Sequence, residues 1–320
     1  MDLMLRRSEY FEQHWNCTVY NASEVPLEAK EHKIFGMFLF AVSTMYIFLS
    51  IPCSIAMCHK ELIQNACYKI MLLMAFCDMV TVQITGFISG YLSYYGLMYC
   101  DARKLNNIGG CILLSFWISY TWGSMILAIN RISYMLNKSY WFEGYKVYVW
   151  ISMPILIGLY SSVFGLPVTY SPIIASWVFN PFTDTVPDVD KVYVMRFHTV
   201  NNVLFTVLLP AVYIAFIYKN MSLLRQRDSQ KMSARDYSLF MQCLIISAAT
   251  TMATLGYTVI QIFRIPIWMS QLSHVLWMFI QGCPPLIYLS MNKSIQRILL
   301  SKFGCTKKAN AVHSTSNVKS

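Results

Sequence analysis

The sequence predicts an all-α membrane protein: a seven-transmembrane helix bundle followed by a short amphipathic helix on the inner membrane surface. Two observations support this fold class. Charged residues make up 12% of the 320 residues and hydrophobic residues 56%, whereas soluble domains carry about 25% charged residues. Seven apolar runs also come close to the roughly 20 residues that a helix needs to cross a bilayer. The fold is therefore expected to have its core inside the membrane.

The elements follow in order along the chain. Residues 1–33 are polar and are expected to form an extracellular tail; they lack the apolar core of a signal peptide, so the first membrane helix is expected to direct targeting. The transmembrane domain is expected over residues 34–291. Its seven runs are 34–58, about 70–95, about 105–130, about 147–170, about 197–218, about 239–263 and about 268–291.

The third run is expected to be the central helix. It carries no charge until its end at Arg131, and an arginine at the end of a membrane helix lies at an interface, where its head group reaches water. Counting back from Arg131 in helical steps selects one face of the helix. That face contains Leu113, Trp117, Tyr120, Ser124 and Leu127. We expect it to line a cavity toward one end of the helix and to present the charge of Arg131 at the other.

The positions of lysine and arginine predict the orientation. Of 25 such residues, sixteen lie in the odd-numbered connections and the carboxyl-terminal segment, and nine lie in the amino-terminal tail and the even-numbered connections. The richer side faces the cytosol in membrane proteins. The protein is therefore expected to be a multi-pass protein of the plasma membrane with an extracellular amino terminus. Asn16 and Asn21, which lie in glycosylation sequons, would then be exposed to glycosylation, and Arg131 would face inward.

The segment after the seventh run, residues 292–320, is expected to be a cytoplasmic helix and tail. Apolar residues recur at helical spacing over 293–303 between basic ones, which is typical of a helix lying on the membrane surface. Cys305 follows this helix. It is a candidate for palmitoylation, and an unmodified thiol is the alternative.

Most of the ten cysteines lie within the membrane runs or on the reducing side. Cys17 and Cys100 are the two that lie plainly outside. A disulfide between them would tie the tail over the mouth of the third helix. Two free thiols are the alternative, and the connection 171–196 contains no cysteine with which either could pair.

Composition and motifs exclude several classes of function. The net charge of +10 is spread over short connections between apolar runs, so membrane topology explains it better than nucleic-acid binding. No catalytic motif of a metalloprotease, serine hydrolase or P-loop enzyme is present. The six histidines are scattered over both sides and the membrane, so neither an enzyme, a cofactor nor a metal site is expected.

Three features within the runs are candidate switch elements. Asp78 lies in the middle of the second run, where an acid marks an ion site or a switch; a neutral packing acid is the alternative. Arg131 is either functional or an interfacial arginine that satisfies the charge rule. Pro284 and Pro285 create a point at which the seventh helix can bend, and Tyr288 follows one turn later; an ordinary helix kink is the alternative.

Aromatic and polar residues gather in the outer halves of the third, fifth, sixth and seventh runs. A small-ligand pocket needs apolar and aromatic walls with a few polar groups. Taken singly, each of these residues is equally typical of helix packing or of interfacial aromatic belts. The candidate ligand-binding residues are Trp117, Tyr120, Asn201, Asn202, Tyr257, Gln261, His274 and Trp277, with His198 and Gln271 nearby.

Several short motifs resemble those of G-protein-coupled receptors. The segment MAFCD at 74–78 resembles the LAxxD pattern of the second helix, Asn130-Arg131 resembles the acid–arginine pair that ends the third, and PLIY at 285–288 resembles NPxxY. The departures are informative. Asn130 is not acidic, so it cannot form an ion pair with Arg131; Pro284 stands in place of the usual asparagine; and the sixth run has no proline.

These departures suit the nematode chemoreceptors, and the chain is similar to serpentine receptor class T (Srt) over roughly residues 34–303. The similarity is carried by NACYKIM at 65–71, AINR at 128–131, HTVNN at 198–202 and GCPPLIYL at 282–289. It implies a receptor of sensory-neuron cilia that detects a small environmental or pheromone-like ligand and signals to a heterotrimeric G protein. A receptor oligomer is compatible with it. The residues implied in coupling or switching are Asp78, Asn130, Arg131, Pro285 and Tyr288.

The resemblance also implies a mechanism. A ligand that binds the active conformation of the bundle more tightly than the resting one would shift the population toward the active conformation. In that conformation the inner helix ends would have moved and opened a cytosolic crevice. The basic connection 219–235 would border that crevice and attract an acidic partner surface or the anionic lipids of the membrane.

Other membrane functions stay open. A ligand-gated channel would need a polar stripe through several helices, whereas the sequence shows single polar residues. A transporter would be favoured by internal repeats, and none is detected. A third alternative is a seven-helix partner or trafficking subunit that binds no ligand.

Overall fold

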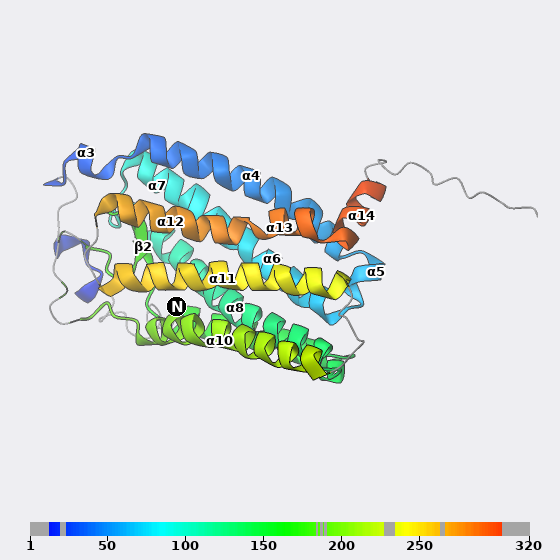
Figure 1. The fold of residues 1–320 in the computed structure, drawn as a ribbon. Coiled ribbons are helices and arrows are strands. Elements are labelled where there is room, and N and C mark those ends of the chain that lie inside the picture. Colours follow the sequence, from blue (N-terminus) through cyan, green and yellow to red (C-terminus); the bar gives the residue numbers. More distant parts are fainter. Residues whose placement is uncertain are drawn as a thin grey trace, which may run out of the picture.

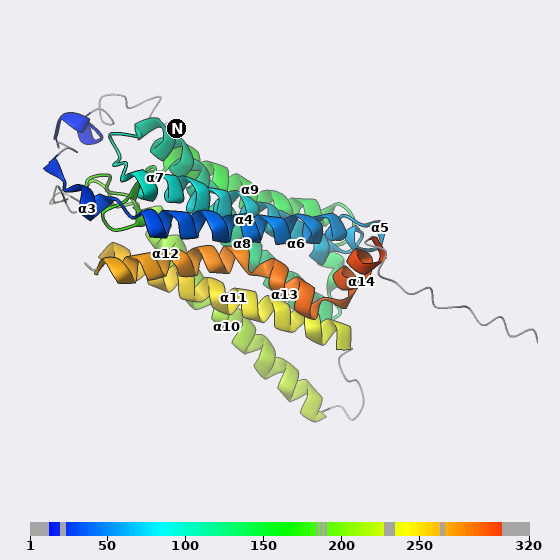
Figure 2. The ribbon, with the colours of Figure 1, turned by 90° about the horizontal axis from the view of Figure 1, so that it is seen from above.

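Seven helical segments lie side by side in a bundle (Figures 1 and 2). The structure is a computed structural model that describes residues 13–19, 24–183, 185, 188, 191–226, 234–262 and 266–302. Two of the seven segments are continued by further elements. In chain order the segments are α4 (Lys33–Met57), α6 (Ala66–Gln83) continued by η3 (Ile84–Ile88) and α7 (Ser89–Tyr95), α8 (Arg103–Met135), α9 (Lys146–Phe164), α10 (Arg196–Gln226), α11 (Ala234–Ile262), and α12 (Ile267–Gly282) continued by α13 (Pro284–Met291).

Length and apolarity agree with membrane crossing. Within the described residues, five helices are long and apolar enough to span a bilayer, and the pair α12–α13, bent by 43°, makes a sixth. Helix α11 contains a shorter apolar stretch, Leu244–Val259. The all-helical membrane bundle predicted from composition is confirmed.

Helix α8 is the central helix, as the pattern along the third run predicts. The apolar part of α8 is 72% buried, against 22% for that of α9, which faces outward. The predicted face from Leu113 to Arg131 is buried along its whole length. Because bulky side chains and a charge are buried on one face of one helix, α8 connects the two ends of the bundle through its interior.

Two glycines allow helix α4 to approach its neighbours. A Cβ at Gly86, in the π-helical turn η3, would lie 1.4 Å from the Ser43 hydroxyl. A Cβ at Gly282 would lie 2.1 Å from the Tyr46 ring. Small residues at such crossings bring membrane helices into close contact, which lets them pack without a hydrophobic driving force.

The fourth run ends earlier than predicted. Helix α9 stops at Phe164, and Gly165 and Pro167 follow, because the residue before a proline is disfavoured in helical conformation. Residues predicted to continue the helix to 170 instead begin a hairpin of β1 (Thr169–Ser171) and β2 (Ser176–Val178), paired antiparallel with Tyr170 opposite Trp177. Among the residues that the structure describes, the strands are therefore confined to this hairpin, which lies at one end of the helical bundle (Figure 1).

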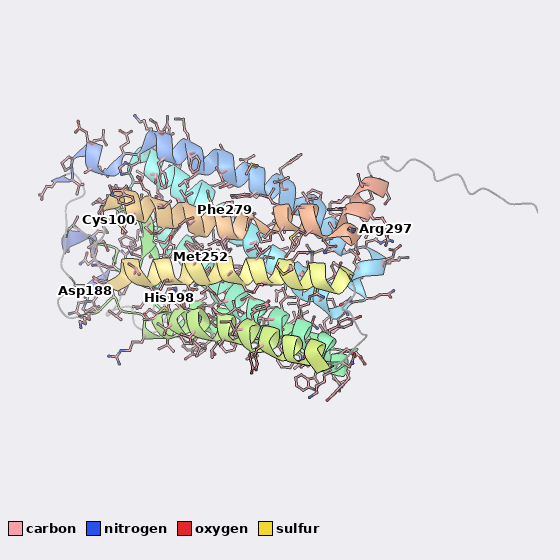
Figure 3. All side chains as sticks on the ribbon, viewed as in Figure 1. Cys100, Asp188, His198, Met252, Phe279 and Arg297 are labelled. Atoms are coloured by element: carbon pink, nitrogen blue, oxygen red, sulfur yellow. A yellow bond between two sulfur atoms is a disulfide. The ribbon has the colours of Figure 1, made fainter. Side chains whose placement is uncertain are left out.

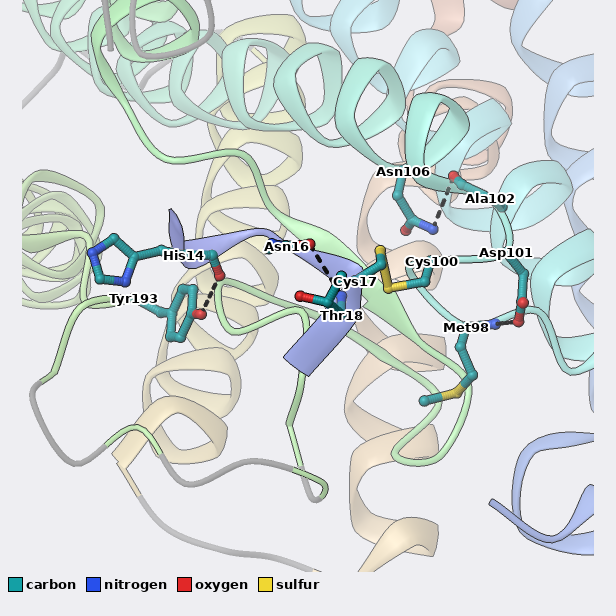
Figure 4. Close-up of a disulfide and its surroundings, with 10 residues drawn as sticks. All are labelled: His14, Asn16, Cys17, Thr18, Met98, Cys100, Asp101, Ala102, Asn106 and Tyr193. Atoms are coloured by element: carbon teal, nitrogen blue, oxygen red, sulfur yellow. Dashed lines mark hydrogen bonds between the residues drawn. A yellow bond between two sulfur atoms is a disulfide. The ribbon is translucent and has the colours of Figure 1, made fainter. Parts of the chain in front are cut away.

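The end that carries the hairpin, called the hairpin end, also carries the tail residues 13–19. A disulfide joins Cys17 and Cys100, the pair that the sequence singles out (Figure 4). Tyr193 donates a hydrogen bond of 2.5 Å to the carbonyl of His14, and its ring contacts that of Trp15, which is fully buried. The tail segment 13–19 is thus packed onto the connection before α10. Asn21 lies outside the described residues.

The opposite end, called the α14 end, carries α5 (Lys60–Ile63), the 3₁₀ turn η4 (Ser139–Trp141) and α14 (Lys293–Lys302). Helix α14 turns away from α13 after Asn292 (Figure 2) and buries Ile295, Ile298 and Leu299, as the predicted surface helix requires. Arg297 forms a 2.5 Å ion pair with Glu61 (Arg297 is labelled in Figure 3). Cys305 lies outside the described residues.

Candidate ligand-binding site

A small cavity lies beneath the hairpin, between α8, α10, α11 and α12. It encloses about 20 Å³, room for little more than one water molecule. None of the described residues that line it is charged. The lining consists of Leu113, Leu114, Trp117, Val168, Trp177, Phe179, His198, Asn202, Tyr257 and Trp277.

Indole and amide groups join α8 to α10 at one wall of this cavity. The Trp117 Nε1 donates to Asn202 Oδ1 at 3.2 Å, and the Trp122 Nε1 donates to Asn201 Oδ1 at 3.2 Å. The Asn202 amide lies 3.4 Å from His198 Nε2. His198, Asn201 and Asn202 stand at positions i, i+3 and i+4, so one face of α10 presents all three to α8. His198 is visible at the hairpin end in Figure 3.

The hairpin forms the roof, and side chains hold it to the helices beneath. The Trp177 Nε1 donates to Ser89 Oγ at 2.8 Å, and the Tyr170 and Ser93 hydroxyls lie 2.6 Å apart. The Tyr170 backbone N–H donates to Asn106 Oδ1 at 2.8 Å. All five side chains are buried, and buried polar groups that are paired in this way hold a loop in one position.

A further chain of hydrogen bonds runs from the hairpin through two helices. The Ser176 hydroxyl donates to the Tyr257 hydroxyl at 3.3 Å, and Tyr257 lies 3.3 Å from His274 Nδ1. His274 Nε2 lies 2.9 Å from the Thr85 carbonyl, which can only accept. The proton of a neutral His274 therefore resides on Nε2, Nδ1 accepts from Tyr257, and the hydroxyl of Tyr257 accepts from Ser176.

This chain ends at an unusual backbone element. Thr85 lies in the π-helical turn η3, and such turns widen a helix locally and often occur at functional sites. His274 thereby joins α12 to the second span, while Tyr257 joins α11 to the hairpin.

Aromatic rings close the cavity on the side away from the hairpin. The Trp277 ring contacts the Trp117 ring edge-on at 5.4 Å between centroids and the Tyr257 ring at 4.6 Å. Tyr120 stacks on Trp117 at 6.4 Å. Edge-to-face and stacked pairs of this kind are favourable, so Trp277 is a floor that a ligand would have to displace or press upon.

Trp277 also begins a polar connection toward the middle of the bundle. With the amide of Gln281 oriented so that its nitrogen donates, the Gln281 oxygen accepts from Trp277 Nε1 at 3.3 Å and the nitrogen donates to Asp78 Oδ1 at 3.3 Å. The same nitrogen lies 3.2 Å from the Thr81 hydroxyl. Asp78 is 3% exposed. Asp78 therefore faces the bundle interior and is connected through Gln281 to the cavity floor.

The predicted ligand-binding residues fall into three groups. Four line the cavity, namely Trp117, Asn202, Tyr257 and Trp277. Tyr120 and His274 contact lining residues from behind, and Asn201 faces the ring of Trp122. The side chain of Gln261 lies outside the described residues.

The roof residues Val168, Trp177 and Phe179 are absent from the sequence-based set. The apolar run predicts a fourth helix through residue 170, which places Val168 in the membrane span and Trp177 and Phe179 in a plain connection. Aromatic and hydroxyl residues on either side of Pro172 are a hairpin signal that could have found the roof.

At the α14 end the structure buries four of the predicted switch residues, Asn130, Arg131, Pro285 and Tyr288. Arg131 is 6% exposed, and its Nη2 lies 4.0 Å from the sulfur of Met71. Asn130 is buried beside it in sequence. The Pro285 carbonyl accepts a weak hydrogen bond from Cys53 at 3.9 Å, and Tyr288 is 2% exposed.

Asn292 is a residue of the α14 end that the sequence did not single out as a switch residue. Its Oδ1 accepts from the Tyr68 hydroxyl at 3.3 Å and from the Ile295 N–H at 3.2 Å, and its amide donates to Gln242 at 3.4 Å. It therefore joins the second, sixth and seventh spans and caps α14, a role that asparagine fills commonly at helix starts.

Comparison with known proteins agrees with this geometry. Residues 3–312 match the family described as serpentine type 7TM GPCR chemoreceptor Srt. Serpentine receptor class T-55 of Caenorhabditis elegans is 21% identical over 247 residues, which cover 76% of this chain and 66% of that protein, just under two thirds of its length. The crystal structure of squid rhodopsin superimposes with a TM-score of 0.66 at 13% identity, covering 88% of this chain and 87% of that one.

Proposed function

The chain belongs to the Srt family of serpentine seven-helix G-protein-coupled chemoreceptors, and from this premise we propose that it binds a small, neutral, largely apolar molecule beneath the hairpin. The observation that carries the proposal is the cavity lining: apolar and aromatic side chains with His198, Asn202 and Tyr257 as its polar groups. A charged ligand would leave water for a site that offers it no counter-charge, which is costly.

The small volume of the cavity sets a condition on binding. Because it encloses about 20 Å³, a volatile- or pheromone-sized ligand fits only after the roof or the floor moves. The ligand then stabilises an opened conformation in proportion to its preference for that conformation. Trp277 is the floor residue best placed to move, since it contacts the cavity on one side and Gln281 on the other.

The proposed signal passes from Trp277 through Gln281 to Asp78, and on to the α14 end. There Arg131, Pro285 and Tyr288, together with Asn130, would border a crevice for a heterotrimeric G protein. Asn130 has no charge with which to hold Arg131, so the resting state is held by contacts such as those of Asp78 and Asn292.

The orientation belongs to the same proposal. The excess of lysine and arginine on the connections at the α14 end supports a cytosolic position for that end. The hairpin end, with the Cys17–Cys100 disulfide and the sequon at Asn16, would be extracellular, where disulfides persist. A plasma-membrane location in sensory cilia follows from the family's chemosensory role.

The test is a screen with size-matched neutral, cationic and anionic small molecules, in cells that express the receptor with a promiscuous G protein. We expect responses to neutral members alone. Trp277→Phe should shift the effective concentration of an active compound at least about tenfold, whereas the matched Trp268→Phe, on the exposed side of the same helix, should not. Responses to charged members alone would refute the proposed ligand class.

A further inference from the structure

A second hollow lies at the α14 end, on the outside of the bundle. It is an open groove of about 560 Å³ lined by Trp141, Lys146, Val149 and Trp150, called here the α9 groove. The Trp150 Nε1 donates to the Trp141 carbonyl at 3.0 Å, and the Phe142 and Trp150 rings stack at 5.1 Å. These contacts hold the turn η4 against the start of α9, so the groove walls are built into the fold.

Two lysines lie at the rim of this groove. Lys138 lies over the Trp141 ring at 5.8 Å, and Lys146 donates to the Tyr140 carbonyl at 3.0 Å while its Nζ lies 5.6 Å from the Tyr140 ring. Glu143 is the acid in this turn, and it accepts from Ser139 at 2.8 Å. The rim therefore combines lysines with aromatic rings, a composition suited to an anionic group at a membrane interface.

The groove continues into an apolar surface. Val149 is 64% exposed and Leu156 63% exposed, and they lie two turns apart on α9, which faces outward. An occupant that fills the groove would therefore extend from a charged rim to a hydrocarbon-facing helix. A phospholipid has this division between charged head and apolar chain, whereas a soluble anion would fill the rim alone.

We propose that the α9 groove binds an acidic phospholipid, with its phosphate beside Lys138 and Lys146 and an acyl chain along Val149 and Trp150. The lipid would fasten the turn between α8 and α9 beside Arg131, the end at which the proposed coupling takes place. Binding itself requires no ligand in the hairpin-end cavity and no G protein, so its test is separate from that of the receptor proposal.

The test is native mass spectrometry of the full chain in detergent, titrated with phosphatidylserine or phosphatidylcholine. Lys138→Gln with Lys146→Gln should weaken phosphatidylserine binding roughly thirtyfold, about fivefold for each lysine near the headgroup. The matched control, Lys60→Gln with Lys302→Gln, makes the same charge change on α5 and α14 and should leave binding unchanged. Replacing Lys138 and Lys146 by arginine should preserve it.

Three outcomes would overturn the proposal. Equal loss in the groove and control variants would mean that only the overall charge matters. Equal affinity for phosphatidylcholine and phosphatidylserine would show that the headgroup charge is not recognised. Loss in the arginine variant as large as in the glutamine variant would show that positive charge at the rim is not what binds.

Discussion

Replacing Tyr257 by phenylalanine should loosen the hairpin roof without disturbing the packing of the bundle. The ring of Tyr257 remains, so its contact with Trp277 is kept. The hydroxyl is lost, and with it the hydrogen bonds to Ser176 and to His274 Nδ1, each 3.3 Å long. The roof then keeps Tyr170 and Trp177 as its attachments.

The magnitude follows from the bond to Ser176 alone, because the bond to His274 joins two helices and is lost equally from the closed and the lifted roof. A neutral hydrogen bond contributes about 1 kcal/mol, so the closed roof should lose about 1 kcal/mol relative to the lifted one. At about 1.4 kcal/mol for each factor of ten, the lifted population rises roughly fivefold. If the ligand binds the lifted form, its apparent affinity should rise by up to the same factor until that form predominates.

Amide hydrogen exchange of the hairpin, residues 169–178, measures this directly on purified receptor, because exchange there reports opening of the roof. The matched control is Tyr213→Phe, which removes a buried hydroxyl that accepts from Ser247 between α10 and α11. Faster exchange of the hairpin is expected in the Tyr257 variant alone. Unchanged hairpin exchange in that variant, or equal acceleration in both, would refute the reasoning.

Three further predictions follow from single features of the structure. Gly86→Ala places a Cβ 1.4 Å from a serine hydroxyl on α4 and should lower thermal stability by about 1–3 kcal/mol, whereas Gly123→Ala, whose new Cβ would meet one side-chain atom at 3.4 Å, should change little in the same melting experiment. Arg131→Ala should abolish G-protein activation at unchanged surface expression; full signalling would reduce Arg131 to an interfacial charge. Asn16→Gln with Asn21→Gln should remove the glycosidase-sensitive mobility shift on gels, and a persisting shift would contradict the proposed orientation.

Hydrophobic periodicity was sufficient to find the spans and the central helix. When a helix buries one face, the residues of that face recur in the sequence with a period of 3.6 residues. The face of α8 from Leu113 to Arg131 is buried as that pattern predicts. The break at Gly165 and Pro167 was equally present in the sequence. The residues beyond the break are also apolar, and periodicity alone does not distinguish a short apolar strand from the end of a buried helix.

Partners across the bundle could not be read from the chain. Trp117 and Asn202 are hydrogen-bonded although they are 85 residues apart, and so are Tyr170 and Ser93, which are 77 residues apart. The sequence around a polar residue does not indicate which distant group will be its hydrogen-bond partner. Spacing placed Asn201 and Asn202 on one helix, but only packing decided that Asn202 lines the cavity while Asn201 faces Trp122.

The sequence by itself determined the membrane class, the number of spans, the central helix and the choice of Cys17 and Cys100 as the candidate disulfide pair. These depend on composition and local periodicity, which each segment carries alone. The tertiary structure decided that a hairpin covers the cavity, that the cavity is small, and that Trp277 is joined to Asp78 through Gln281. Such features arise where separate helices meet, and the geometry of their crossing is set by the packing of all of them together.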